Sequence, residues 1–188
     1  MTYNEYLYCA EKHLKGCASL LLSYQMHEKR DKHVWLELYY LSGYILEGIV
    51  VYSAYKLNNW NPSDDIRLKY NLSFTQRTNL DFYYNRTRII NGRERIPSFF
   101  QNRPPGSLSV QGHKFQEIVR RLLKPDPSFN SIPYLGNGII DSDVEQLIDN
   151  WRPEVRYKYI AQQMSPTLNQ DLIARLLNTC FTIYSNHV

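Results

Sequence analysis

The heptapeptide WRPEVRY, residues 151–157, brings two cations, an anion and two aromatic rings into one short stretch. Pro153 suits the first turn of a helix, and the glutamate after it favours the positive end of the helix dipole. Arg152 and Arg156 are four residues apart, so an α-helix would place both on one side. Two such arginines can bind a phosphate or carboxylate through forked hydrogen bonds. Arg152, Arg156 and Tyr157 are therefore the candidate anion- or nucleotide-binding residues.

A structural role competes with anion binding at the same stretch. In this interpretation Arg156 forms an ion pair with Glu47 of the second predicted helix, and the rings pack over the arginine side chain. Perturbed ion pairs are structural as often as functional, so the sequence favours a Glu47–Arg156 lock over a binding site. Neither interpretation assigns a catalytic residue.

Other residue patterns argue against metal and cofactor sites. His27, Glu28 and His33 lie in a polar connection and lack the i,i+4 spacing of a helical metal site. No EF-hand pattern surrounds the acidic pair that begins at Asp64, and no glycine-rich phosphate-binding loop is present. We therefore expect neither a metal nor a cofactor.

Composition indicates one globular domain. The 188 residues are 43% apolar and 21% charged, and sixteen tyrosines favour extensive helix–helix or subunit contacts. The three cysteines, Cys9, Cys17 and Cys180, form no CxxC pair, which favours a reducing compartment. The N-terminal sequence has no apolar signal-peptide core, so we expect a cytoplasmic protein.

Two long helices open the chain. Thr2 and Glu5 form a possible capping box, and apolar residues at three- and four-residue spacing predict a helix to about residue 25. Residues 34–57 predict a second helix that is apolar around most of its circumference. A membrane span is the alternative. The carboxylates of Glu37 and Glu47 would be costly inside a bilayer, so we expect a bundle core helix.

The stretch 58–111 differs in character and is predicted to be an insertion within the single domain 1–188. Apolar and polar residues alternate strictly over 66–74, which predicts a half-buried strand, and the alternation resumes after a possible turn. We expect a hairpin followed by a long loop that contains Asn91–Gly92.

The same insertion is basic. Residues 58–112 hold eight Lys and Arg against four Asp and Glu, and the rest of the chain balances. Cations interleaved with rings suit single-stranded nucleic acid, which makes Arg86, Arg88, Arg93 and Arg95 weak candidates for nucleic-acid contact. The alternative is a hairpin packed on the bundle with its arginines solvated, and the alternation favours that alternative.

Helices return in the C-terminal half. One is predicted to begin at 112, a second at a capping box of Ser142 and Glu145, and a third at a capping box of Thr167 and Gln170. The predicted fold class is therefore all-α: an up-and-down bundle of four to five helices, with the partly β insertion between the second and third.

The predicted helices resemble the HEPN superfamily (higher eukaryotes and prokaryotes nucleotide-binding). The resemblance is carried by YLYCAEKHLKGCASLLL, LSGYILEGIVVYSAYK, GHKFQEIVRRLL, and WRPEVRYKY ahead of a final amphipathic helix. It covers about residues 1–57 and 112–188 and leaves the insertion outside. The resemblance implies a homodimeric bundle that acts beside a nucleotidyltransferase or antitoxin-like partner, or as a ribonuclease.

Catalytic HEPN members carry an Arg-x4–6-His motif, in which the arginine binds phosphate and the histidine assists attack by the 2′-hydroxyl. No histidine of this chain follows an arginine at that spacing. We therefore expect a non-catalytic module that binds a nucleotide, RNA or another anion. The alternative is a metal-independent ribonuclease with a non-standard site, in which Arg152 or Arg156 holds the phosphate and a distant residue such as His113 is the base.

Overall fold

The residues that the computed structural model describes are predominantly helical, as the sequence predicts. It describes residues 2–26, 32–57, 61–63, 81–83, 88–90, 93–95, 107–109, 113, 115–119, 141–157 and 164–186. The chain divides into two compact units. One comprises Met1–Glu5 and Val50–Asn130, and the other comprises Tyr6–Ile49 and Ser131–Val188. We call the second one the helical unit, since it contains residues 151–157 and most of the long helices.

Helix α1 (Asn4–Met26) begins as predicted. The amide of Thr2 donates to a carboxylate oxygen of Glu5 over 2.9 Å, which is one half of the capping box. The exposed pair of Glu11 and Lys15 is formed at 2.5 Å. The predicted apolar face points inward, and three of its residues are fully or nearly buried: Ala10, Leu14 and Cys17.

Helix α2 (Lys32–Leu57) is the apolar centre of the fold. Apolar residues along much of its length are buried, including Leu38, Ile45, Leu46, Ile49 and Val50. Among the described residues, one stretch, Lys32–Ser53, is long and apolar enough to cross a membrane, and 67% of that window is buried inside the structure. Burial on this scale is typical of the core helix of a bundle.

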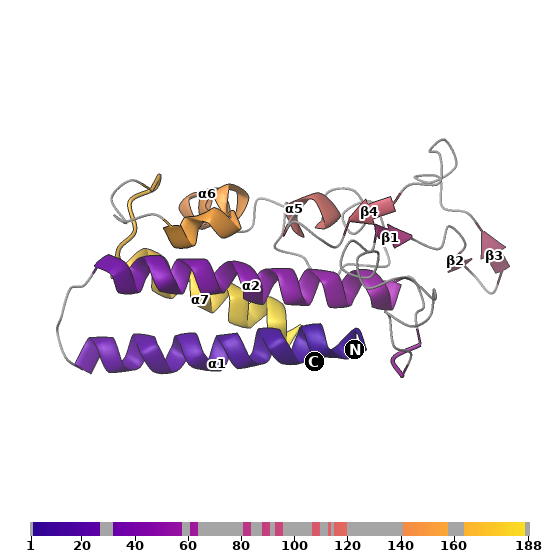
Figure 1. The fold of residues 1–188 in the computed structure, drawn as a ribbon, viewed down its shortest axis with the longest axis horizontal. Coiled ribbons are helices and arrows are strands. Elements are labelled where there is room, and N and C mark those ends of the chain that lie inside the picture. The colour runs from indigo at the N-terminus through magenta and orange to yellow at the C-terminus, as the bar shows by residue number, and fades with distance from the viewer. Residues whose placement is uncertain are drawn as a thin grey trace. The chain divides into compact units, whose positions relative to one another are not determined.

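Four α-helices of the helical unit pack together among the residues that the structure describes. Figure 1 shows α1 and α2 side by side and antiparallel, with α7 (Gln170–Ser185) beside them and α6 (Ser142–Asn150) packed against α2. Gly48 allows the close approach of α1 and α2, since a Cβ there would lie 2.6 Å from the carbonyl oxygen of Tyr6. The Cys180 thiol lies 3.9 Å from the Ser42 carbonyl oxygen, which joins α7 to α2.

The caps of α6 and α7 differ from the predicted capping boxes. Asp141 caps α6 in place of Ser142, and its carboxylate accepts hydrogen bonds from two amides of the first turn. Asn169 caps α7 in place of Thr167, and its side-chain oxygen accepts from the Leu172 amide over 2.9 Å. Both predictions were wrong because Asp is as good an N-cap as Ser, and Asn is a better one than Thr.

The other unit contains short strands. β1 (Asp81–Tyr83) pairs antiparallel with β4 (Ser107–Ser109), and β2 (Arg88–Ile90) pairs antiparallel with β3 (Arg93–Arg95). Strands β2, β3 and β4 lie where the sequence predicts a long loop. The predicted strand at 66–74 is outside the described residues. Of the helix predicted to begin at 112, the structure describes α5 (Phe115–Ile118).

Candidate anion-binding site

The heptapeptide 151–157 leaves α6 and forms the short 3-10 helix η3 (Pro153–Tyr157), with Pro153 as its first residue as predicted. The Val155 amide donates to the Arg152 carbonyl over 3.0 Å, which closes the first turn. A 3-10 helix has three residues per turn, so residues four apart no longer share a face. Arg152 and Arg156 would lie on one side of an α-helix. Because η3 is a 3-10 helix, that expectation does not apply to this segment.

Trp151 anchors this segment to α2. Its side chain is 1% exposed, its Nε1 donates to the carbonyl of Tyr40 over 3.1 Å, and its ring meets the edge of Tyr44 at 5.3 Å between centroids. The indole lies directly on the backbone of Gly43, where an added Cβ would be 1.8 Å from Trp151 Cε2. Only glycine at position 43 leaves room for the indole in this position.

A second contact joins α2 to α6 next to the first. The Tyr39 hydroxyl, which is buried, donates to the carbonyl oxygen of Leu147 over 2.7 Å. Burial raises the pKa of this hydroxyl, so it remains a hydrogen-bond donor at physiological pH. The C-terminal half of α6 is therefore held in place before η3 begins.

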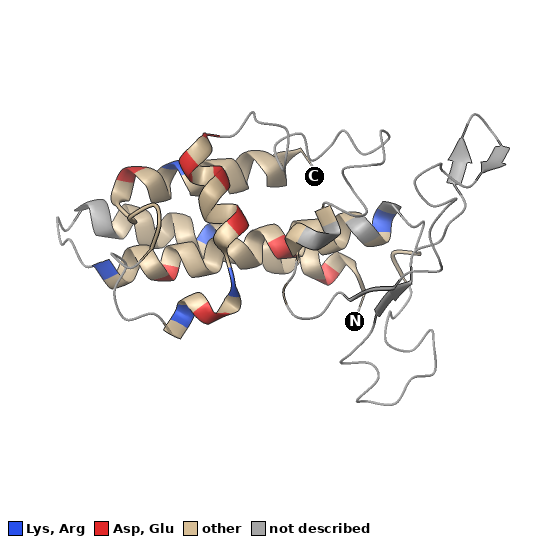
Figure 2. Cartoon of the chain, turned by 90° about the horizontal axis from the view of Figure 1, so that it is seen from above, with Lys and Arg blue, Asp and Glu red and all other residues tan. Residues whose placement is uncertain are grey.

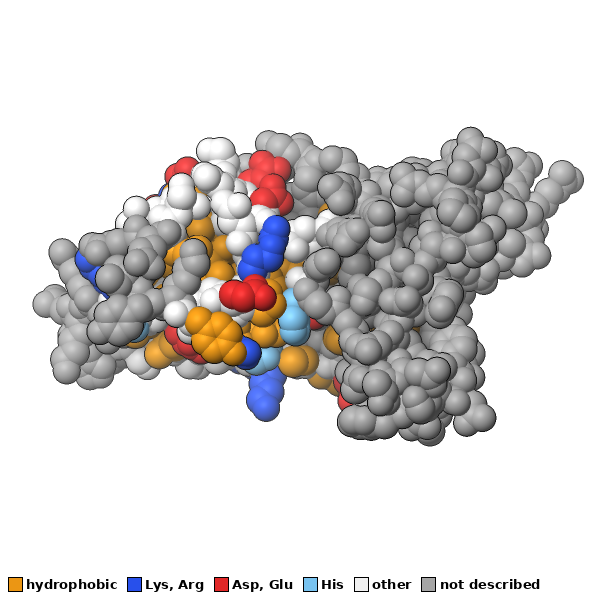
Figure 3. Space-filling view, turned by 45° about the horizontal axis from the view of Figure 1, so that its top comes forward, with side chains coloured by type: hydrophobic (Ala, Val, Ile, Leu, Met, Phe, Trp, Pro, Cys, Tyr) orange, Lys and Arg blue, Asp and Glu red, His pale blue; other side chains and the backbone are white. Residues whose placement is uncertain are grey.

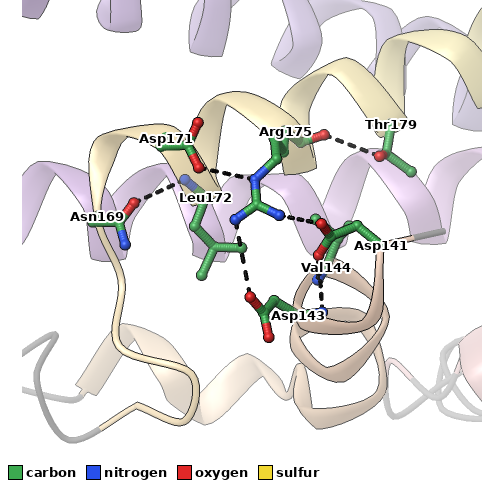
Figure 4. A network of polar contacts seen from close by, with 8 residues as sticks. All are labelled: Asp141, Asp143, Val144, Asn169, Asp171, Leu172, Arg175 and Thr179. Carbon is green, nitrogen blue, oxygen red and sulfur yellow. Dashed lines mark hydrogen bonds and ion pairs between the residues drawn. The ribbon is translucent and has the colours of Figure 1, made fainter.

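Arg175 of α7 fixes the other end of α6 (Figure 4). Its Nη1 donates to the cap residue Asp141, its Nε lies 3.0 Å from Asp171 of its own helix, and its Nη2 lies 3.9 Å from Asp143. Burial alone would raise the pKa of Asp141, but two amides of the first turn and Arg175 lower it overall. The N-termini of α6 and α7 are thus joined through one guanidinium, with η3 in the connection between the two helices.

Arg152 bonds back toward α6. Its Nη1 donates to the carbonyl oxygen of Asp149 over 2.9 Å and to that of Trp151 over 2.5 Å. Basic groups at this end of a helix satisfy carbonyls that have no partner within the helix, and they offset the negative end of the dipole. The bonds of Arg152 give it a structural role at the end of α6.

Arg156 bonds to tyrosines instead. Its Nη1 lies 3.5 Å from the hydroxyl of Tyr40, and its Nη2 lies 2.5 Å from the hydroxyl of Tyr157. The guanidinium carbon also lies 4.6 Å from the centroid of the Tyr157 ring, within the range of a cation–π contact. Both side chains are exposed, and the surface of Tyr157 is 72% exposed. The structure therefore brings together two of the three predicted binding residues, Arg156 and Tyr157.

The tyrosine that receives Arg156 belongs to a cluster of rings. The Tyr40 hydroxyl donates to the Tyr44 hydroxyl over 3.0 Å, and the ring of Tyr44 lies 6.1 Å from the imidazole of His13. Burial, then the bond to Tyr40 and the charge of Glu47, raise the pKa of Tyr44, while the charge of Arg156 lowers it. Glu47 and Arg156 therefore act on the same hydroxyl with opposite signs. The direct Glu47–Arg156 ion pair stays a prediction.

The imidazole of His13 is half-buried in α1. Burial, and then the nearby charge of Lys12, lower its pKa. The imidazole is therefore neutral at physiological pH and can accept a proton.

Charges of both signs gather near η3. The charged side chains of α6 are all acidic, whereas η3 and the residue before it carry acid and base together (Figure 2). Figure 3 shows a face on which ring-bearing, cationic, acidic and histidine side chains lie close together. Such a surface can offer an anion both a cation and a ring on which to stack.

Sequence reasoning missed Tyr40, Tyr44 and His13. One available signal was the i,i+4 spacing of Tyr40 and Tyr44, which places their rings on one face of α2. Contact between that face and residues 151–157 depends on how α6 packs against α2, and no local pattern reports it.

The remaining predicted residues are placed less completely. Arg88 and Arg95 face each other in the register of β2 and β3, and Arg93 pairs with Ile90, whereas Arg86 lies outside the described residues. His113 belongs to the unit that does not contain Arg156. Among the described residues, no group of three or more His, Cys, Asp and Glu is arranged to hold a metal ion.

Comparisons with known proteins give no match. No protein-family model matches the chain, and no curated protein or solved structure is significantly similar to it.

Proposed function

We propose that this chain is a non-catalytic helical module that binds a phosphate-bearing ligand, a nucleotide or RNA, through Arg156 and Tyr157. The observation that carries the proposal is the contrast between two arginines. Arg175 is bonded to carboxylates, which offset its charge, whereas the bonds of Arg156 run to two neutral hydroxyls. Arg156 therefore presents a full positive charge at an exposed position beside an exposed ring, and this combination suits a phosphate next to a base.

The resemblance to the HEPN superfamily supports the same proposal. It suggests a cytoplasmic homodimer that works beside a nucleotidyltransferase or antitoxin-like protein. The predominantly helical character of the described residues is consistent with such a bundle. Subunit number and partner are open to direct measurement by native mass spectrometry of the purified protein at low salt.

Calorimetric titration with adenosine 5′-monophosphate and with a short single-stranded RNA tests the binding function. We expect the wild-type protein to bind and R156A to lose binding. R156K should bind more weakly than the wild type, because lysine keeps the charge and loses the forked geometry. Binding should also weaken as salt rises, since phosphate contacts release counterions.

Arg152→Ala is the matched control, because it removes the same charge from the same segment. The bonds of Arg152 run to carbonyls of α6, so R152A should retain ligand binding even if it lowers the stability of the helix end. Equal losses in R152A and R156A would indicate general electrostatic attraction and would refute a defined site. No binding by the wild type at low salt would refute the proposed function itself.

A second candidate function, metal-independent ribonuclease activity, is favoured by one observation. The imidazole of His13 lies beside the ring of Tyr44, and the charge of Arg156 acts on the hydroxyl of that same tyrosine. Because the pKa of His13 is lowered, its imidazole is neutral and can act as a base. In such a reaction the base takes the 2′-hydroxyl proton, the 2′-oxygen attacks the phosphorus, and the 5′-oxygen leaves with a proton from solvent. Cleavage of RNA by the wild type and not by H13A, with a 2′,3′-cyclic phosphate product, would establish it. No cleavage of structured or single-stranded RNA would exclude it.

A further inference from the structure

Both terminal nitrogens of Arg156 are already bonded in the free protein. Nη1 donates to the hydroxyl of Tyr40 and Nη2 to the hydroxyl of Tyr157, at 3.5 Å and 2.5 Å. These bonds raise the pKa of the guanidinium, which is their expected electrostatic consequence. The side chain that would bind an anion is therefore held by two other acceptors.

The hydroxyl of Tyr40 is oriented to accept. It donates its own proton to Tyr44 over 3.0 Å, so a lone pair remains for Arg156. Hydrogen bonds that run in one direction polarise each other, and the chain from Arg156 through Tyr40 to Tyr44 is of that kind. Tyr40 and Tyr44 are half-buried members of α2, so this acceptor is fixed by the bundle.

The hydroxyl of Tyr157 belongs to η3 itself. Its ring is exposed, and it contacts the guanidinium both through its oxygen and through its face. Arg156 is thus bound between a rigid acceptor on α2 and an exposed acceptor on its own segment.

An anion must compete with these hydroxyls. A phosphate oxygen carries negative charge and can accept two parallel hydrogen bonds from a guanidinium, which a neutral hydroxyl cannot do, so a phosphate can displace a hydroxyl. The displaced bond is lost, and the observed affinity falls by the free energy of that bond. Alternatively the hydroxyls stay in place and help to bind the anion, in which case their removal weakens binding. Removal of a hydroxyl therefore raises the affinity for the anion in the first arrangement and lowers it in the second.

We propose that the hydroxyls of Tyr40 and Tyr157 form a latch that holds Arg156 away from anionic ligands, and that a phosphate group binds by releasing it. We call these three residues the Arg156 latch. The proposal rests on the proposed function, since it describes the regulation of the same site. It makes the affinity of the site depend on two neutral oxygens that a bound phosphate replaces.

The first test needs no ligand. Phenylglyoxal modifies arginines according to how accessible their guanidinium groups are, and mass spectrometry of the peptide that contains residues 151–157 reads the modification of each arginine. We expect Arg156 in Y157F to react about threefold faster than in the wild type, which corresponds to one weak hydrogen bond. The phenylalanine side chain in this variant keeps the ring, so only the hydroxyl is removed. Arg152, on the same peptide, should react at an unchanged rate.

The second test uses adenosine 5′-monophosphate as the probe. The latch predicts that Y157F binds it about threefold more tightly than the wild type, and that Y40F shifts the affinity in the same direction. Thermal unfolding of each variant distinguishes release of Arg156 from damage to the fold, because substitution of the exposed Tyr157 should leave the melting temperature unchanged. R156A, which lacks the guanidinium, gives the level of adenosine 5′-monophosphate binding that does not involve the site.

The outcomes separate the two proposals. Faster modification of Arg156 together with tighter binding in Y157F supports the latch. Unchanged modification, or weaker binding in Y157F than in the wild type, overturns the latch and leaves the binding function intact if R156A still abolishes binding. Faster modification with no binding by any variant refutes the proposed function and, with it, the release of Arg156 by phosphate, although the two hydroxyls would still shield Arg156 in the free protein.

Discussion

Substitution of Gly43 by alanine should destabilise the protein, although alanine is the better helix former. A Cβ at position 43 would lie 1.8 Å from Cε2, 2.1 Å from Nε1 and 2.2 Å from Cδ2 of the Trp151 indole. Carbon atoms in contact are separated by roughly 3.5–4.0 Å, so the indole must move by about 1.7–2.2 Å. That movement breaks the bond from Nε1 to the Tyr40 carbonyl and the edge contact with Tyr44.

The magnitude follows from opposing terms. Overpacking a core costs about 1–3 kcal/mol, and partial loss of a buried tryptophan adds about 2 kcal/mol more. Replacing glycine by alanine in a helix returns about 1 kcal/mol. The expected net loss is about 2–4 kcal/mol, or roughly 4–16 °C in the melting temperature of a chain of this size. Thermal and urea unfolding followed by circular dichroism measures it.

Gly16→Ala is the matched control. Gly16 is an exposed position of α1, and nothing lies within 4 Å of an added Cβ. There the same substitution should stabilise the protein by about 0.5–1 kcal/mol. In a W151A background, where the clash is absent, G43A should likewise cease to destabilise. A G43A protein as stable as the wild type would refute the inferred packing of the Trp151 indole against Gly43 of α2.

Three further predictions follow from buried groups of the helical unit. Tyr39→Phe should lower the unfolding free energy by about 1–2 kcal/mol in urea titration, because the buried carbonyl of Leu147 loses its donor; an unchanged midpoint would contradict that bond. Native iodoacetamide labelling should modify exposed Cys9 quickly and spare Cys17, since burial raises the pKa of Cys17 to about 12; equal labelling would disprove its burial. Because burial lowers the pKa of His13 in the fold, the stability it confers is complete above about pH 6.5 and falls as the pH drops toward that lowered pKa. H13Q should flatten this decline, and an unaltered pH profile would contradict the inferred burial.

Local patterns in the sequence predicted the helices well. The apolar spacing of α1 predicted a helix, and the same spacing in α6 places Val144, Leu147, Ile148 and Trp151 in the core, where all four are buried. Such patterns succeed because the 3.6-residue period of a helix must match the face that it buries. Helix ends were less predictable, since several adjacent polar residues can serve as the N-cap. Asp141 and Asn169 cap their helices one residue before and two residues after the predicted positions.

The site was predicted only in part, for a different reason. Arg156 and Tyr157 are adjacent in sequence, so their contact is local and a sequence pattern can suggest it. The partner of Arg156 on α2 is far away in the sequence, and the sequence suggested Glu47 because opposite charges are the strongest visible complement. The structure gives Arg156 the hydroxyl of Tyr40, and a neutral acceptor of this kind carries no charge signal.

The contact between Trp151 and Gly43 holds α6 against α2 without any contribution from Arg156. In a bundle where α6 were held to α2 by ion pairs alone, Arg156 would need a carboxylate to fix η3 in place. Here the buried indole and the Tyr39–Leu147 bond already position the segment, so the arginine is not required to hold the helices together. Exposed ion pairs contribute little to stability in any case. A cation that the fold does not need for its stability can keep its charge for a ligand, and this is the physical basis for proposing Arg156, and not Arg175, as the binding residue.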